Sequence, residues 1–109
     1  MLKIVLADDH HVVRQGLRIL LESVMMCKVV GEASDGREAV TIVERLKPDV
    51  LVVDMLMPDL NGLEVIRRVQ EDGNTRTRIV VLSMHADEGY VREALRAGAH
   101  AYVLKEARA

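Results

Sequence analysis

The sequence predicts a doubly wound α/β domain, in which helices cover both faces of a parallel sheet. Short apolar runs alternate with amphipathic helical patterns along nearly all of its 109 residues. Five strand-like runs are separated by four helical segments, so each helix must return the chain to the same end of the sheet. Right-handed crossovers then place helices on both faces.

The five expected strands are short and rich in Val, Ile and Leu, as is typical of strands that are buried on both faces. The second run is the weakest of them, because Lys28 and Gly31 interrupt it. The runs cover residues 2–7, 27–33, 50–53, 79–82 and 101–104. Their spacing leaves room for one helix between each pair of successive strands.

The four expected helices carry apolar residues at spacings of three and four, which mark one buried face. Asp35 with Glu38 three residues later predicts a capping box at the start of the second helix, and Pro48 ends that helix. Gly98 stands where a left-handed cap would end the fourth helix. The apolar stripes are Val13, Leu17, Leu20 and Val24; Ala39, Val43 and Leu46; Leu63, Ile66 and Val69; and Val91, Ala94 and Leu95.

Composition excludes several classes of function. A net charge of −2 and only two tyrosines as aromatic residues argue against a chain that binds nucleic acid or membranes by itself. The single cysteine, Cys27, excludes an internal disulfide and a cysteine-based metal cage, and it fits a reducing compartment. No apolar run approaches the roughly 20 residues of a membrane helix. The sequence therefore predicts one small cytoplasmic domain.

Polar residues that can do chemistry follow four of the expected strands. Asp8 and Asp9 follow the first strand, Asp54 closes the third, Ser83 follows the fourth and Lys105 follows the fifth. Doubly wound sheets bind their ligands beyond the carboxyl ends of the strands. If the first, third, fourth and fifth strands lie side by side, these side chains converge on one place.

Three converging carboxylates repel each other, and a hard divalent cation relieves that repulsion. Mg²⁺ prefers a few carboxylate oxygens together with waters, so it suits this set better than zinc. A carboxylate beside Mg²⁺ and a lysine is also suited to attack phosphorus. The pattern predicts Asp54 as the nucleophile, with Lys105 and the Ser83 hydroxyl on the phosphate oxygens.

Five separated motifs resemble the response-regulator receiver domain of bacterial two-component systems. They are Asp8-Asp9-His10, Asp54-Met55-Leu56-Met57-Pro58, Asn61-Gly62, Leu82-Ser83-Met84 and Tyr102-Val103-Leu104-Lys105. Two further features, Arg14-x-Gly16-Leu17 and Ser83-Met84-His85 leading to Tyr90-Val91, are most similar to the NarL/FixJ (LuxR-type) subclass. The resemblance covers nearly the whole chain and implies a flavodoxin-like sheet with strand order 2-1-3-4-5.

The resemblance implies a set of metal ligands. Asp9 and Asp54 would bind Mg²⁺ directly, together with the backbone carbonyl of Leu56. Asp8 would act mainly through water. His10, next to these acids, is expected to contribute local hydrogen bonds or pH sensitivity rather than a chelating pair.

The resemblance also implies how the domain is switched. Asp54 would accept a phosphoryl group from a sensor histidine kinase, and Ser83 and Lys105 would contact the phosphate. Tyr102 would be the switch aromatic that turns inward when Ser83 moves. Such a domain catalyses its own phosphorylation and dephosphorylation but turns over no metabolite.

Receivers of this subclass usually precede a helix-turn-helix DNA-binding domain, and their fifth helix starts after the position of Lys105. The last residue of the sequence is Ala109. We therefore expect residues 1–109 to be a receiver domain whose fifth helix is missing and which is truncated before a DNA-binding output domain that regulates transcription. A partner chain covering the bare face is the alternative. Glu106 also departs from the proline that many receivers have there.

Other interpretations stay open at this point. Asp8 and Asp9 alone could be a helix N-cap pair, and Ser83 could bond to nearby backbone. An Asp-nucleophile phosphatase would want Asp-x-Asp after the first strand, and a flavin or nucleotide carrier would want a Gly-rich loop there. A receiver that binds partners without phosphate is a fourth possibility. A homodimer could form through the fourth helix and fifth strand, with Tyr90 and Tyr102, or through the face without a fifth helix.

Overall fold

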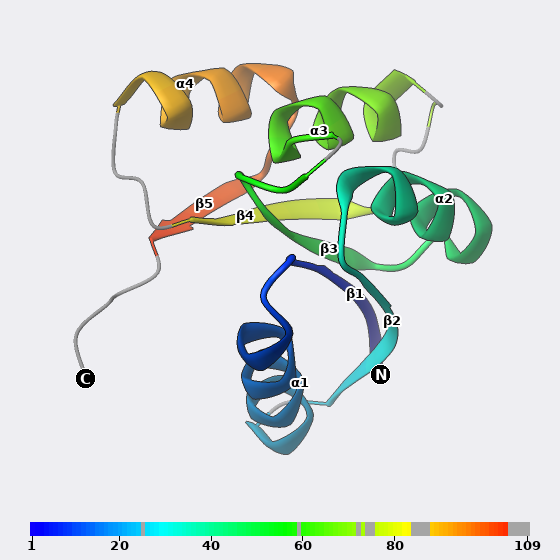
Figure 1. Ribbon diagram of the computed structural model, residues 1–109. Coiled ribbons are helices and arrows are strands. Elements are labelled where there is room, and N and C mark those ends of the chain that lie inside the picture. The colour runs from blue at the N-terminus through cyan, green and yellow to red at the C-terminus, as the bar shows by residue number, and fades with distance from the viewer. Residues whose placement is uncertain (25, 59, 72, 74–75, 84–87, 105–109) are drawn as a thin grey trace.

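A five-stranded parallel sheet with the order β2-β1-β3-β4-β5 forms the centre of the molecule (Figure 1). The computed structural model describes residues 1–24, 26–58, 60–71, 73, 76–83 and 88–104. The predicted fold class and the strand order 2-1-3-4-5 are both confirmed. The prediction of a missing fifth helix concerns residues beyond 104 and lies outside the described part of the chain.

Strands and helices alternate along the chain. The strands are β1 (Leu2–Ala7), β2 (Cys27–Ala33), β3 (Val50–Asp54), β4 (Arg78–Ser83) and β5 (Ala101–Leu104). The helices are α1 (His11–Val24), α2 (Gly36–Leu46), α3 (Gly62–Glu71) and α4 (Glu88–Ala97). Neighbouring strands all pair in parallel, so their carboxyl ends lie at the same edge of the sheet.

The sheet separates two hydrophobic clusters, because successive side chains of a strand point to opposite faces. Val5 and Ala7 of β1 belong to the larger cluster, which also contains buried residues of α2, α3 and α4. Ile4 and Leu6 of the same strand belong to the smaller cluster, against which α1 packs. Figure 1 shows the corresponding layers, with α1 on one face of the sheet and the other three helices on the opposite face.

The strands agree closely with the apolar runs in the sequence. β1, β2 and β5 coincide with the predicted ranges, whereas β3 extends to Asp54 and β4 runs from Arg78 to Ser83. Asp54 and Ser83 are therefore the last residues of strands rather than the first residues of loops. Ladder hydrogen bonds fix the backbone at these positions, which makes them rigid supports for side chains.

The four predicted helices are all present, but three residues predicted to lie on their buried faces are exposed instead. Leu20 is 58% exposed, and Leu21 packs against the smaller cluster instead. Leu46 and Leu95 are 39% and 48% exposed. Each of these helices contacts the sheet along a narrow row, and one step along a helix turns a side chain about 100° away from such a row. The side chain of Val24 lies outside the described residues.

The helix ends follow the predicted signals. Asp35 caps α2 by accepting a hydrogen bond from the Glu38 backbone N–H at 2.9 Å, and Glu38 reaches back to the Ser34 N–H at 2.7 Å. Gly98 has a φ of 122°, as expected for the residue that ends α4. Among the described helices, none has the length and apolar character needed to cross a membrane.

Asp49 ties the amino-terminal ends of the strands together, at the edge of the sheet opposite to Asp54. Its carboxylate accepts hydrogen bonds from the Lys3 backbone N–H at 2.8 Å and from the Arg76 guanidinium at 3.1 Å. Its backbone N–H donates to the Lys3 carbonyl at 2.9 Å. The hydrogen bond from Lys3, aided by Arg76, holds the pKa of Asp49 below its usual range.

Replacing Asp49 by asparagine should destabilise the fold near neutral pH but not in acid. Because the pKa is lowered in the folded state, the ionised carboxylate stabilises the fold above about pH 3.9, the value for an unperturbed aspartate. That contribution is lost as the pH falls through the lowered folded-state value. Urea unfolding midpoints of native protein and Asp49→Asn should differ near neutral pH and converge below about pH 4. A difference that does not change with pH would contradict this explanation.

Candidate functional site

Three strand ends bring the predicted site residues to one edge of the sheet. Asp8 follows β1, Asp54 is the last residue of β3, and Ser83 is the last residue of β4. Because β3 pairs with both β1 and β4, these three positions lie side by side. Lys105, which is predicted to follow β5, lies outside the described residues.

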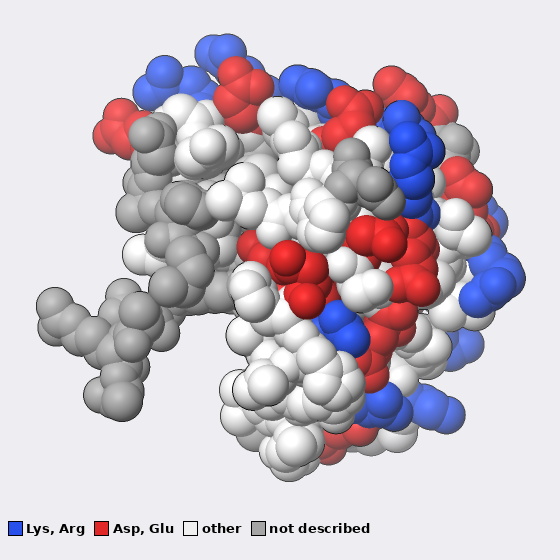
Figure 2. Space-filling model, in the orientation of Figure 1, with Lys and Arg blue, Asp and Glu red and all other residues white. Residues whose placement is uncertain are grey.

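Four side chains form an acidic cluster at this edge, namely Asp8, Asp9, His10 and Asp54. Each can offer one ligand atom such that all of these atoms lie within 4.8 Å of one another. Asp8 and Asp54 are only 3% and 6% exposed, whereas Asp9 and His10 are open to solvent. Figure 2 shows acidic side chains gathered in the middle of this face, above α1. The three carboxylates thus converge as the strand pattern predicts.

His10 connects the two carboxylates of the β1–α1 loop. Its backbone N–H donates to Asp8 Oδ1 at 2.8 Å, and its ring Nδ1 lies 3.2 Å from both Asp8 Oδ1 and Asp9 Oδ1. These contacts are the local hydrogen bonds expected for this histidine. The backbone N–H is a donor beside the Asp8 carboxylate and so offsets part of the negative charge at this loop.

The acidic cluster fits a hard divalent cation. Its three carboxylates come from the β1–α1 loop and the end of β3, and carboxylate oxygens are the ligands that Mg²⁺ prefers. Asp8 and Asp54 are buried, so water screens the repulsion between their carboxylates only weakly. This repulsion favours a positive charge placed between them. Leu56, whose carbonyl is a predicted ligand, lies two residues beyond Asp54, and its role stays a prediction.

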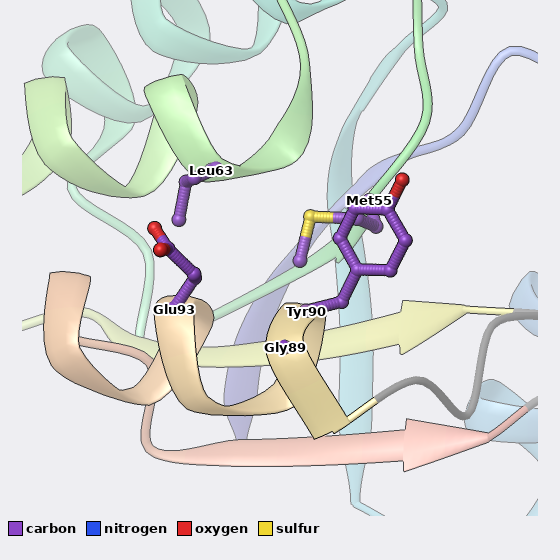
Figure 3. A pocket seen from close by; sticks show the side chains of 5 residues that line it. All are labelled: Met55, Leu63, Gly89, Tyr90 and Glu93. Carbon is purple, nitrogen blue, oxygen red and sulfur yellow. The ribbon is translucent and has the colours of Figure 1, made fainter.

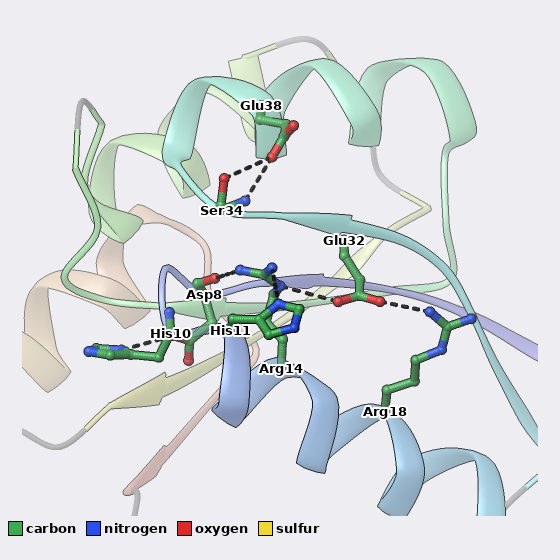
Figure 4. A network of polar contacts seen from close by, with 8 residues as sticks. All are labelled: Asp8, His10, His11, Arg14, Arg18, Glu32, Ser34 and Glu38. Carbon is green, nitrogen blue, oxygen red and sulfur yellow. Dashed lines mark hydrogen bonds and ion pairs between the residues drawn. The ribbon is translucent and has the colours of Figure 1, made fainter.

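The β1–α1 loop is held in place from the neighbouring strand β2. The Asp8 backbone N–H donates to the Ala33 carbonyl at 3.0 Å, and the Asp8 carbonyl accepts from the Arg14 guanidinium at 2.6 Å. The same guanidinium donates through Nε to Glu32 of β2 at 3.2 Å. Figure 4 shows the Arg14 guanidinium between Asp8 and Glu32, so one side chain connects the loop to the strand.

The β3–α3 connection brings the start of α3 against the backbone of Asp54. The Gly62 N–H donates to the Met55 carbonyl at 2.8 Å, and Asn61 Oδ1 accepts from the Glu64 N–H at 3.0 Å. A Cβ atom on Gly62 would lie 2.6 Å from the carbonyl oxygen of Asp54. Asn61-Gly62 therefore does more than mark a turn, since Asn61 caps α3 and Gly62 permits the close approach to Asp54.

The two predicted switch residues stand on adjacent strands. Ser83 is fully buried at the end of β4, and Tyr102 is a partly buried residue of β5 that packs against the larger hydrophobic cluster. In the β4–β5 register, Val81 lies opposite Tyr102 and Ser83 lies opposite Leu104. The fold thus places both residues close to the site edge, and their roles in switching stay predictions.

A cavity of about 400 Å³ lies between α3 and α4 (Figure 3). It is lined by Met55, Leu63, Gly89, Tyr90 and Glu93. Met55 follows Asp54 directly in the sequence, so a residue that lines the cavity is the neighbour of a residue of the acidic cluster. Tyr90, which is 41% exposed, contributes to the lining of the cavity from α4.

The fold and the site together define a doubly wound α/β domain with a cluster of acidic side chains at the carboxyl edge of its sheet. The family model of the response regulator receiver domain matches residues 4–109, and the chain belongs to this family. The family predicted from the five sequence motifs is thereby confirmed. The protein is the receiver domain of a two-component response regulator.

Similar proteins include NarL/LuxR-type transcriptional regulators, in agreement with the predicted subclass. The uncharacterized transcriptional regulatory protein YhcZ of Bacillus subtilis is 44% identical over 106 residues, which cover 96% of this chain and 49% of that protein. The nitrate/nitrite response regulator NarL of Escherichia coli K12 is 40% identical over 103 residues, covering 94% of this chain and 47% of NarL. The chain spans about half the length of these relatives.

Solved structures agree with the fold. The signal receiver domain of the putative response regulator NarL from Mycobacterium tuberculosis superposes with a TM-score of 0.92 at 33% identity, covering 98% of this chain and 86% of that chain. The isolated receiver domain of RcsB from Salmonella enterica, solved in the presence of the phosphomimetic BeF₃⁻, gives a TM-score of 0.87 at 27% identity. It covers 98% of this chain and 79% of that chain.

The sequence alone does not indicate the two residues that hold the β1–α1 loop in place, which are Arg14 and Glu32. In the sequence Arg14 stands out only as part of a subclass motif, and Glu32 does not stand out at all. Their contact joins positions 18 residues apart, and no local periodicity points to it. An arginine one helical turn beyond the acidic motif, with a carboxylate at the end of the next strand, is the signal that could have indicated it.

Replacing Gly62 by alanine should destabilise the domain by about 1–3 kcal/mol, because the new Cβ would overlap the Asp54 carbonyl and push the backbone apart. Gly16→Ala is the matched control, since a Cβ at this helical position has nothing within 4 Å. That control should stabilise the domain by up to about 1 kcal/mol through helix propensity. Urea unfolding measures both, and equal stability of Gly62→Ala and native protein would contradict the close-approach argument.

Proposed function

We propose that this domain is a phosphorylation-controlled switch in which Asp54 accepts a phosphoryl group from a sensor histidine kinase. The observation that carries the proposal is the position of Asp54. Its carboxylate ends a buried strand, is 6% exposed, and lies in the acidic cluster with Asp8 and Asp9. A carboxylate held in this way is aligned by the backbone and needs only a donor that approaches from the open edge of the sheet.

The transfer forms one bond and breaks another at phosphorus. A carboxylate oxygen of Asp54 forms the new P–O bond, while the bond between phosphorus and the imidazole nitrogen of the donor breaks. The imidazole keeps the electron pair of the broken bond. In dephosphorylation, water attacks phosphorus and releases inorganic phosphate together with the Asp54 carboxylate. The domain catalyses only these two reactions of its own side chain.

Other residues position and neutralise the groups that react. When bound, Mg²⁺ supplies positive charge beside the phosphate oxygens and lowers the repulsion that an incoming phosphoryl group meets. Asp9 and Asp54 would hold the ion directly with the Leu56 carbonyl, and Asp8 would hold it through water. Lys105 and the Ser83 hydroxyl would contact the remaining phosphate oxygens.

The phosphorylated domain controls transcription. Attraction of Ser83 to the new phosphate frees space beside it, and Tyr102 turns inward on the neighbouring strand. The relatives YhcZ and NarL are a transcriptional regulatory protein and a nitrate/nitrite response regulator, which supports a transcriptional output. The DNA-binding domain that would carry this output stays a prediction from the resemblance. The switch works in the cytoplasm, where the single cysteine stays reduced. Association of two copies through α4 and β5 stays a prediction.

Replacing Asp54 by asparagine should abolish phosphorylation, because the amide is a poor nucleophile. Native protein incubated with Mg²⁺ and acetyl phosphate should gain the mass of one phosphoryl group, measured by intact-mass spectrometry. Asp49→Asn is the matched control, because it changes an aspartate at the opposite edge of the sheet, and it should gain the same mass. A gain that survives in Asp54→Asn would rule out Asp54 as the acceptor.

The same sample separates the switch from an Asp-nucleophile phosphatase. The sequence has Asp8-Asp9-His10 after the first strand where that class needs Asp-x-Asp. A switch should take up one phosphoryl group and release it slowly. Many turnovers of an aryl phosphate per protein molecule would favour the phosphatase instead.

Replacing Asp9 by alanine should remove most of the stabilisation by Mg²⁺. The ion binds the folded domain and should raise the melting temperature of the native protein by mass action. Without metal, Asp9→Ala should be at least as stable as native protein, since one of three repelling charges is gone. Asp35→Ala is the control, because it removes the cap of α2 and lowers stability without touching the cluster. A rise with Mg²⁺ as large in Asp9→Ala as in native protein would exclude Asp9 as a ligand.

A further inference from the structure

We propose that Arg14 is a positioning residue for the metal ligands, held in place by Glu32. This inference rests on the proposed function, since it concerns the cation site of the acidic cluster. Arg14 itself contributes no oxygen to that site. It acts on the backbone from which the Asp8 and Asp9 carboxylates project.

The peptide unit between Asp8 and Asp9 is the part that Arg14 controls. Arg14 Nη1 donates to the Asp8 carbonyl oxygen at 2.6 Å. A peptide unit is planar, so fixing this carbonyl fixes the plane that runs from the Cα of Asp8 to the Cα of Asp9. The direction of both carboxylates depends on the orientation of that plane. A rotation of this unit would move both side chains relative to Asp54.

Two adjacent residues of β2 hold Asp8, one of them directly and the other through Arg14 of α1. Ala33 accepts a hydrogen bond from the Asp8 N–H directly at 3.0 Å. Glu32 acts through Arg14, whose Nε lies 3.2 Å from Glu32 Oε1. The Asp8 N–H is therefore held by β2 directly, and the Asp8 C=O is held by Arg14 of α1, which is in turn held by Glu32 of β2. Figure 4 shows this arrangement from β2 across Arg14 to the loop.

The Arg14–Glu32 contact is sheltered and directional. Their side chains are 13% and 20% exposed, so the ion pair is screened less than a pair at the open surface. The planar guanidinium donates in two directions at once, which a lysine ammonium on a flexible stem does not match. Arg14 Nη2 also lies 3.2 Å from His11 Nδ1, and this contact further limits the rotation of the guanidinium. The side chain is thus preorganised to orient the carbonyl of Asp8.

Arg18 supplies a matched control within the same helix. Its Nη1 donates to Glu32 Oε2 at 2.8 Å, so it shares the partner of Arg14. Arg18 lies one helical turn further from the cluster and is 44% exposed. A role in general stability would be shared by the two arginines. A role in orienting the metal ligands belongs to Arg14 alone.

The test measures Mg²⁺ affinity by isothermal titration calorimetry, together with the melting temperature of each metal-free protein. Groups that orient metal ligands typically change metal affinity 10–100-fold when they are removed. Arg14→Met should weaken Mg²⁺ binding by about 10-fold or more, and Arg18→Met by less than about 2-fold. Arg14→Lys keeps the charge but not the two-directional donation, so it should remain several-fold weaker than native protein. A role in stability alone would lower the melting temperatures and leave the Mg²⁺ affinity unchanged.

Each outcome separates the positioning role from the proposed function. If native protein does not bind Mg²⁺, the cation site itself is wrong. If native protein binds and Arg14→Met binds equally well, or if Arg14→Lys has native affinity, the positioning role is overturned while the site stands. If Arg14→Met does not fold, Glu32→Gln replaces it, because that variant keeps an oxygen acceptor but loses the charge that orients Arg14. Glu32→Gln should bind Mg²⁺ several-fold more weakly, and native affinity would again overturn the inference.

Discussion

Repulsion among three carboxylates is the interaction on which the rest of this structure depends. Parallel pairing forces the carboxyl ends of β1 and β3 together, and the sequence puts Asp8, Asp9 and Asp54 there. Two of these side chains are nearly buried, so water can do little to separate their charges. In the proposed function, a bound cation would relieve this repulsion, so the electrostatic cost that the free domain carries would favour cation binding.

Rigid support on both sides keeps this repulsion from opening the site. On one side, the loop after β1 is bonded to β2 through Ala33 and through Arg14 with Glu32. On the other side, α3 begins directly against the backbone of Asp54, because Gly62 has no Cβ atom. Like charges would otherwise move the loops apart, and the ligand atoms would no longer lie within 4.8 Å of one another. Preorganisation here means that neighbouring elements, rather than the loops themselves, set the geometry.

The sequence is sufficient to predict the features that depend on local patterns. The strands follow from apolar periodicity, and the caps at Asp35 and Gly98 follow from the residue types that favour those positions. The convergence of the three acids follows from the rule for parallel sheets once the strand order is known, and the resemblance to the receiver family implies that order. The choice between Leu20 and Leu21 could not be predicted, since both are apolar and only the packing angle of α1 decides which one faces the sheet. The contact of Arg14 with Glu32 is hidden for a similar reason, because it depends on how α1 lies across β2.

The sheet also determines which residues lie next to Asp54 on the side away from β1. Asp54 lies opposite Leu82, and the next residue, Ser83, is fully buried and pairs with Leu104 of β5. The end of β4 is therefore joined to β5 by strand pairing, whereas β2 is joined to α1 by the contacts of Arg14 and Arg18 with Glu32. Because Tyr102 and the exposed Val103 and Leu104 all belong to β5, this strand joins the buried edge of the site to the molecular surface. The same carboxyl edge thus carries the acidic cluster at the ends of β1 and β3, and at β4 and β5 it joins the buried Ser83 to exposed residues of the surface.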